Sequence, residues 1–161
     1  MQQTTGWGDE TAVEIAAAPE HVWSLLADVT RMGEWSPACS RCEWTDGAVG
    51  PAVGARFVGY SRQGIVRWSR VCEITASEPG RDFAFRTFFK GAESTRWRYQ
   101  LEPTPTGTRV TESYEVLVMP RWVQFLHHVP GMHAKARRDA RNSMASTLAC
   151  LRITAEGRTD T

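Results

Sequence analysis

The sequence lacks an excess of charge of either sign. Nineteen Lys and Arg residues oppose eighteen Asp and Glu residues, which leaves a formal net charge of +1. This balance argues against a strongly basic nucleic-acid-binding protein and against an acidic tail protein. We therefore expect no nucleic-acid partner.

Long apolar runs and targeting signals are also lacking. No apolar run approaches the roughly 18 residues that a membrane-spanning helix requires. The opening stretch MQQTTGWGDET has neither a basic segment nor an apolar one, so we expect no signal peptide. These absences favour a cytoplasmic protein without a membrane span.

The common catalytic and metal-binding motifs are missing as well. The chain contains no GxSxG, no Walker loop, no GxGxxG after a strand and no HExxH. Cys39 and Cys42 form a CxxC, but 85 residues separate Cys42 from His128, the nearer member of a pair with His133. That gap is far too long for a zinc finger. We expect no metal and no cofactor.

The CxxC also lacks the setting of a redox motif. Such motifs normally open a helix beside a parallel βαβ unit, whereas this one opens an expected strand. Reduced cysteines without a special role are the first interpretation, and a redox or regulatory role is the alternative.

The chain is long enough for one domain and is rich in large aromatic residues. Its 161 residues fit one domain that can bury a hydrophobic core without staples. Seven Trp and six Phe residues either pack that core or line a cavity for an apolar ligand. We expect a flexible N-terminus over 1–10, one domain over 11–155 and a flexible tail over 156–161.

Hydrophobic periodicity predicts seven strands and a few helices. A strand is expected over 11–16, then a helix that starts at Pro19 and is interrupted at Gly33 and Pro37. Turn residues then divide the chain into six strand-like segments. These are RCEWT, ARFVGY, IVRWSRVCEIT, DFAFRTFF, STRWRYQLE and TRVTESYEVLV.

The chain after residue 119 is expected to be helical. A short helix over RWVQFLHH precedes a long helix of about twenty residues that starts at Met132. The order of elements predicts an α+β fold in which a curved seven-stranded antiparallel sheet wraps a long C-terminal helix, with two short helices after the first strand. Small residues on the helix stripe, Ala136 and Ala140, predict a pocket between helix and sheet.

Several segments resemble one known superfamily. They are VEIAAAPEHVWSLLADVTRMGEWSP, VGARFVGY, CEITASEPGRDFAFR and GTRVTESYEV, in this order. Over about residues 11–152 the chain is similar to the SRPBCC superfamily, also called START-like or helix-grip, and most of all to its polyketide cyclase/dehydrase-like branch. The resemblance implies the helix-grip fold. It does not select one activity, because members include aromatase/cyclases, lipid and sterol carriers, hormone receptors and allergens. It also implies that the loop with Trp35 closes one mouth of a cavity, with packing of the turn as the alternative role.

Period-two alternation assigns the strand side chains to two faces. On the inward face lie candidate ligand-binding residues, which the long helix opposes from the other side. They are Trp68, Phe85, Trp97, Tyr99 and Tyr114 from the strands, with Ala140 and Met144 from the helix. For the Trp and Tyr residues, simple core packing is the competing interpretation.

Two charged residues share that inward face, Arg70 and Glu112. A buried charge without a partner costs several kcal/mol, so each needs a counter-charge, a ligand or water. They either pair or lie at the rim, or they anchor a ligand carbonyl or phenol. If the protein is an enzyme, Glu112 is the candidate base, Arg70 the group that stabilises an enolate oxygen, and Tyr99 or Tyr114 the proton donor.

The leading functional hypothesis is that the cavity binds a small hydrophobic molecule, aromatic, polyketide-like or lipid-like. The alternative is a polyketide cyclase/dehydrase-type enzyme that uses the same cavity. A third option is a protein-interaction module that forms a homodimer through the convex face of the sheet.

Overall fold

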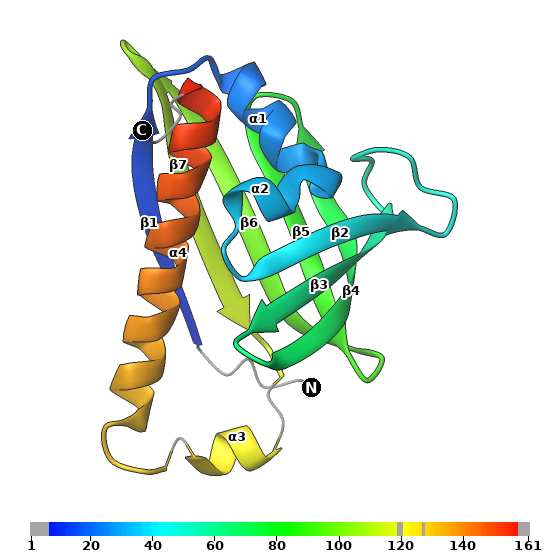
Figure 1. Ribbon diagram of the computed structural model, residues 1–161, viewed down its shortest axis with the longest axis vertical. Coiled ribbons are helices and arrows are strands. Elements are labelled where there is room, and N and C mark those ends of the chain that lie inside the picture. The colour runs from blue at the N-terminus through cyan, green and yellow to red at the C-terminus, as the bar shows by residue number, and fades with distance from the viewer. Residues whose placement is uncertain (1–6, 119–120, 127, 158–161) are drawn as a thin grey trace.

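The computed structural model describes residues 7–118, 121–126 and 128–157. It contains one antiparallel sheet in the order β1-β7-β6-β5-β4-β3-β2 (Figure 1). The seven strands are β1 (Trp7–Ile15), β2 (Cys39–Thr45), β3 (Arg56–Gln63), β4 (Val66–Glu78), β5 (Asp82–Phe89), β6 (Ala92–Thr104) and β7 (Gly107–Val116). The predicted seven-stranded sheet is therefore confirmed.

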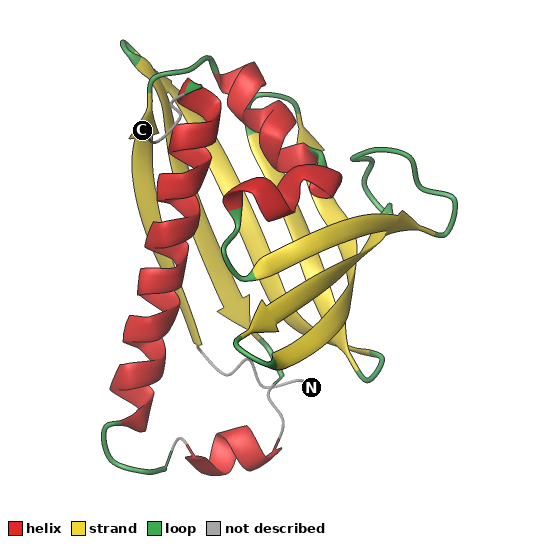
Figure 2. Cartoon of the chain, in the orientation of Figure 1, coloured by secondary structure: helices red, strands yellow, loops and turns green. Residues whose placement is uncertain are grey.

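Helices α1 (Pro19–Ala27), α2 (Met32–Trp35) and α4 (Met132–Glu156) cover the concave side of this sheet, and α3 (Arg121–Leu126) lies beyond its end (Figure 1). The 3-10 turn Val29–Arg31 lies between α1 and α2. Figure 2 shows α4 as one long rod beside β1, with α1 and α2 across the other half of the sheet. The helix-grip prediction, with short helices after the first strand, is confirmed.

Local sequence explains the first helical segment. Pro19 occupies the first turn of α1, where its missing N–H leaves no bond unmade. The apolar stripe Val22, Leu25 and Leu26 is fully buried, as its helical spacing requires. The interruption expected at Gly33 is only partial, because the chain continues through the 3-10 turn into α2.

Regular secondary structure extends farther toward both ends of the described chain than the predicted strand and helix do. β1 begins at Trp7, because Trp7 to Glu10 pair with β7 from Val116 to Ser113. α4 runs to Glu156, whose carboxylate accepts hydrogen bonds from the Ala16 backbone N–H at 2.9 Å and from Arg152 at 3.1 Å. The rest of the expected flexible segments, 1–6 and 158–161, lies outside the described residues.

The two faces of the sheet follow the predicted alternation. Phe83, Tyr99, Leu101 and Val110 are buried on the concave face. The convex face carries a ladder of ion pairs across the strands. Its pairs are Arg56–Glu73 (3.0 Å), Arg86–Glu73 (2.7 Å), Arg96–Glu93 (2.6 Å) and Arg98–Asp82 (2.7 Å). Much of the arginine in the chain therefore serves a solvated outer surface.

The long helix is buried only along its C-terminal half. Met144, Thr147, Leu148 and Leu151 pack inward, whereas Met132 is 37% exposed. The first three turns, MHAKARRDAR, offer little apolar surface to bury, so the predicted stripe holds from residue 144 onward. In the described residues, no helix is long and apolar enough to cross a membrane.

Candidate functional site

A cavity of about 340 Å³ lies between the concave face of the sheet, α4 and the α2–β2 segment. Strands β3 to β7 supply one wall, and Ser143, Met144 and Thr147 of α4 supply the other. Seven of the candidate residues line it. They are Trp68, Arg70, Phe85, Trp97, Tyr99, Glu112 and Met144.

The cavity is polar at one buried point. Glu112 is 2% exposed, and its Oε1 accepts a hydrogen bond of 2.9 Å from the hydroxyl of Tyr99. The two residues are direct neighbours across β6 and β7. The second carboxyl oxygen, Oε2, is buried and has no hydrogen-bond partner among the described residues. An unsatisfied buried acceptor costs about 1–3 kcal/mol, so this atom is set up to receive a further group.

Burial changes the proton affinity of both members of this pair. Desolvation raises the pKa of Glu112 to about 7, although the hydrogen bond from Tyr99 partly opposes the shift. Burial and the nearby carboxylate raise the pKa of Tyr99 well above its ordinary value. Near neutral pH the phenol therefore stays protonated, while the carboxyl exchanges its proton readily.

Arg70 lies apart from Glu112, with contacts of its own. Its guanidinium carbon sits 4.9 Å from the centroid of the Phe89 ring, and Nη1 donates a hydrogen bond of 3.0 Å to the carbonyl of Ser69. Arg70 is only half-buried, so it occupies the rim of the cavity. Among the described residues no ion pair joins Arg70 to Glu112, so the two charges do not compensate each other.

Aromatic rings form much of the remaining wall. Phe85 is 7% exposed and packs edge-on against Phe57 with a centroid distance of 5.4 Å. Trp97 lies deeper in the sheet, whereas Trp68 is 36% exposed near the mouth. The wall is therefore closely packed and apolar inside, and its side chains become more exposed to solvent toward the rim.

Three candidates lie outside the cavity lining. Trp35 is fully buried behind the wall, where its ring meets that of Tyr99 edge-on at 6.1 Å. Tyr114 stacks on Trp97 and borders a small separate hollow beside Trp7. Ala140 is half-buried on α4, one turn before Met144. Trp35 is thus packed in the core and does not line the cavity, and the helix contributes to the cavity about one turn later than expected.

Sequence reasoning missed part of the lining. Thr87 and Thr95 line the cavity, and strand alternation already places both on the inward face. Cys39 and Cys42 line the cavity too. Plain alternation would have placed these two cysteines on opposite faces, so periodicity could not reveal them.

A larger hollow of about 950 Å³ lies on the loop between β2 and β3. It is lined by the continuous segment 46–56, mostly Gly, Ala, Val and Pro, and opens widely to solvent. Because it lacks converging polar groups and walls from several elements, we assign the functional site to the smaller cavity. Among the described residues, no three His, Cys, Asp or Glu side chains cluster in a way that could hold a metal ion.

The model of one protein family, described as polyketide cyclase / dehydrase and lipid transport, matches residues 10–150. The chain belongs to this family. A comparison with curated proteins finds no relative.

Solved structures agree with the family assignment. A polyketide-cyclase-like protein from Corynebacterium glutamicum is 30% identical over 96% of both chains, with a TM-score of 0.55. A START superfamily protein from Mycobacterium smegmatis is 16% identical, with 96% and 100% of the chains covered and a TM-score of 0.72. The di-domain ARO/CYC protein StfQ, from the steffimycin biosynthetic pathway, is 15% identical with a TM-score of 0.74. The alignment with StfQ covers 94% of this chain and 51% of that one. These last two likenesses establish a shared fold.

Proposed function

We propose that this member of the polyketide cyclase/dehydrase and lipid transport family binds a small hydrophobic molecule in the cavity between its sheet and α4. The observation that carries the proposal is a cavity of about 340 Å³ with aromatic walls and one buried acid–phenol pair. Pockets for small ligands start at about 300 Å³ and combine apolar walls with a few fixed polar groups.

The unsatisfied oxygen of Glu112 defines one property of the ligand. A ligand hydroxyl can donate to Oε2 when Glu112 is ionised, and a ligand carbonyl can accept from Glu112 when it is protonated. Either bond removes the penalty of the unpaired acceptor. The ligand is therefore a hydrophobic molecule with an oxygen function at the end that reaches β7.

Arg70 adds a second polar point at the opposite, rim side of the cavity. Its contacts in the free protein are a ring face and one carbonyl, so it keeps donors available for a carbonyl or phenolate. A ligand with oxygens at both ends, such as a polycyclic phenol, fits this pair of polar groups better than a plain fatty acid.

Titration of intrinsic tryptophan fluorescence tests the proposal, because Trp68 and Trp97 are part of the wall. We expect saturable quenching by one class in a panel of polycyclic phenols, flavonoids, fatty acids and sterols. Flat responses across the whole panel would contradict a binding cavity and would favour the homodimeric interaction module.

The variant Arg70→Ala sharpens that test. It should weaken binding about tenfold, equivalent to about 1.4 kcal/mol, and leave the unfolding midpoint unchanged because Arg70 is half-exposed. The matched control is Arg67→Ala, on the outward face of the same strand, which should bind as the wild type does. Equal affinity in both variants, or unfolding of Arg70→Ala alone, would remove Arg70 from the site.

A second candidate function is a cyclase/dehydrase reaction in the same cavity. The specific observation in its favour is the pKa of about 7 for Glu112, which suits a group that takes up and returns protons near neutral pH. In an aldol cyclisation, Glu112 would remove a proton next to a ligand carbonyl, a carbon–carbon bond would form, and water would leave. Tyr99 would hold the carboxyl in place.

Binding and turnover can be separated with Glu112→Gln. In an enzyme, this variant keeps binding a poly-β-ketone chain but no longer releases the dehydrated ring, which mass spectrometry detects as loss of water. In a binding protein, neither the wild type nor the variant changes the mass of the poly-β-ketone.

The proposal includes a cytoplasmic location, as the sequence favours.

A further inference from the structure

An irregularity in β2 brings two cysteines to one side of the strand. Cys39 pairs with Ser61 of β3, but Arg41 pairs with Tyr60, so Ser40 is an extra residue in the ladder. In a regular strand, residues three apart point to opposite faces. The β-bulge resets this phase, and as a result both Cys39 and Cys42 line the cavity.

The bulge is held in place from both sides. The hydroxyl of Ser40 donates a hydrogen bond of 2.9 Å to the carbonyl of Tyr60. On the other side, the Ser40 carbonyl packs so closely on Gly33 of α2 that a Cβ there would lie 2.6 Å away. Contacts of Ser40 with β3 and α2 therefore fix the position of the two thiols.

The two sulfur atoms touch. The distance from Cys39 Sγ to Cys42 Sγ is 3.4 Å, and both thiols are free. Their surroundings differ, since Cys39 is half-buried, whereas Cys42 is 4% exposed and packs 3.7 Å from the sulfur of Met32. This is the asymmetry of an accessible attacking thiol next to a sheltered resolving thiol.

The electrostatics agree with this division of roles. A hydrogen bond from Cys42 lowers the pKa of the Cys39 thiol, and that same bond, together with burial, raises the pKa of Cys42. Cys72, the third thiol in the cavity wall, has a pKa raised to about 12 by burial and is less able to attack.

We propose that Cys39 and Cys42 are an oxidisable dithiol that forms an intrachain disulfide in the wall of the cavity. The oxidant is a low-molecular-weight disulfide such as oxidised glutathione. The Cys39 thiolate attacks one of its sulfurs, a mixed disulfide forms and one thiolate leaves. Cys42 then loses its proton and attacks Cys39, the internal bond forms and the second thiolate leaves, so two protein thiols and one external disulfide give one protein disulfide and two external thiols.

Oxidation changes the shape of the cavity wall. The sulfurs must approach from 3.4 Å to about 2.05 Å, and Cys42 cannot move without changing its contact with Met32. This inference goes beyond the proposed ligand and does not depend on it, because the exchange takes place in the free protein.

The test is a redox titration of the full chain in buffers of reduced and oxidised glutathione, quenched with acid and alkylated in denaturant. We expect two of the four cysteines to lose alkylation in the wild type. Because trypsin cleaves after Arg41, the disulfide will join two peptides, one that ends at Arg41 and one that starts at Cys42. Four alkylated cysteines under oxidising conditions, or a bond that involves Cys72 or Cys150, would overturn the proposal.

A linear peptide of residues 37–44 gives the reference for preorganisation. The folded protein should be half-oxidised at a ratio of oxidised glutathione to the square of reduced glutathione about tenfold lower than the peptide, since the fold already holds the sulfurs together. Equal oxidation midpoints for the protein and the peptide would contradict the claim that the β-bulge positions the two thiols for disulfide formation.

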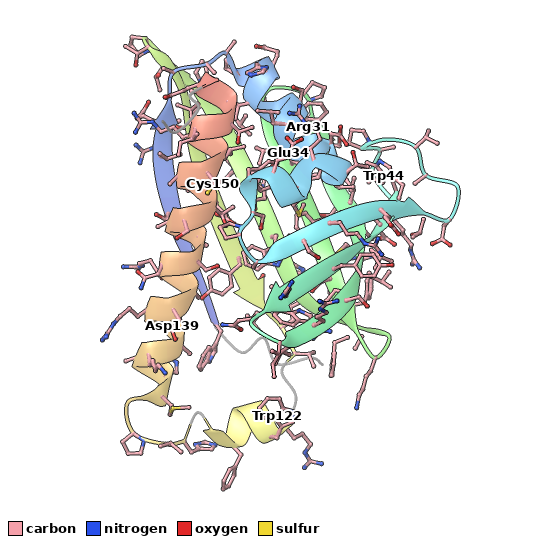
Figure 3. The ribbon with its side chains drawn as sticks, viewed as in Figure 1. Arg31, Glu34, Trp44, Trp122, Asp139 and Cys150 are labelled. Carbon is pink, nitrogen blue, oxygen red and sulfur yellow. The ribbon has the colours of Figure 1, made fainter. Side chains whose placement is uncertain are left out.

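Single variants test the two roles. Cys42→Ser should accumulate a mixed disulfide with glutathione at Cys39, because the resolving thiol is gone, whereas Cys39→Ser should remain largely unmodified. The control is Cys150→Ser on α4 (Figure 3), a cysteine outside the cavity lining, which should oxidise as the wild type does. Equal mixed-disulfide formation in Cys39→Ser and Cys42→Ser would refute the assignment.

Discussion

At the scale of single residues, Glu112 is the side chain whose chemistry the fold changes most. It sits 2% exposed with one oxygen bonded to Tyr99 and the other unpaired. Its pKa rises from the ordinary value of 4.5 to about 7 because burial disfavours the charged form. A protein that only needed a stable core would be better served by an apolar residue at this position.

This shift makes stability depend on pH. The folded state holds the proton more tightly than the unfolded state, so the contribution of Glu112 to stability is fully present below about pH 4.5 and is lost as the pH rises to about 7. The loss amounts to about 3 kcal/mol in the free energy of unfolding. Glu112→Gln should abolish it, which urea unfolding at pH 5 and at pH 8 will measure.

The control for this prediction is Glu102→Gln, an exposed carboxylate on β6. It should leave the difference between pH 5 and pH 8 as large as in the wild type. If Glu112→Gln also retained the whole difference, the raised proton affinity of Glu112 would be refuted.

Residue positions in the regular strands could be predicted from the sequence. Alternation placed Trp97, Tyr99 and Glu112 on the inward face, and all three line the cavity. It could not show that Tyr114, on the same face as Glu112, lies past the end of the cavity and borders another hollow. Alternation gives the face of a residue but not its position relative to the cavity, which depends on how the helix crosses the sheet.

At the scale of elements, the contact between α2 and β2 sets the position of one cavity wall. Gly33 approaches the backbone of Ser40 so closely that any side chain would collide with the Ser40 carbonyl. The sequence indicated only a helix-breaking role for Gly33. A close approach of two backbones leaves no pattern in hydropathy, and neither does the β-bulge that carries Cys39.

Gly33→Ala tests this contact by the sign of its effect. Helix propensity alone would make the substitution stabilising by about 1 kcal/mol. The collision should reverse this and lower the free energy of unfolding by about 2 kcal/mol. The control is Gly50→Ala, where a Cβ meets nothing within 4 Å, and its stability should be nearly unchanged in the same urea titration. A stabilised Gly33→Ala protein would contradict the described packing.

The long helix shows a different limit of sequence reasoning. Its apolar period gave the correct face at Met144, Leu148 and Leu151, but the same period continued through Ala136 and Ala140, where the helix is more exposed. Which part of a helix overlaps a sheet depends on tertiary contacts, and α4 packs against β1, α2, α1 and β7. Trp122, on α3, is 68% exposed (Figure 3).

At the scale of the whole molecule, the order of elements was enough to obtain the architecture. One strand, two short helices, six consecutive strands and one long helix can bury their apolar faces together only if the sheet curves around the last helix. The cavity is what remains between them where Ser143 and Thr147, on either side of Met144, face the aromatic strands. The presence of the cavity could be predicted from the sequence. Its outline could not, because it depends on how α4 crosses the sheet.

The central claim is that this cavity, and no other surface, receives a hydrophobic ligand. The most direct test is to measure binding of a fluorescent hydrophobic probe, 1-anilinonaphthalene-8-sulfonate, to the wild type and to two variants of α4. Ser143→Phe fills the cavity from an exposed position on the helix, and Asn142→Phe adds the same ring one residue away, outside the lining. We predict saturable binding to the wild type and to Asn142→Phe, and affinity at least about tenfold weaker in Ser143→Phe. Equal affinity in all three proteins would place the binding site elsewhere and contradict the account.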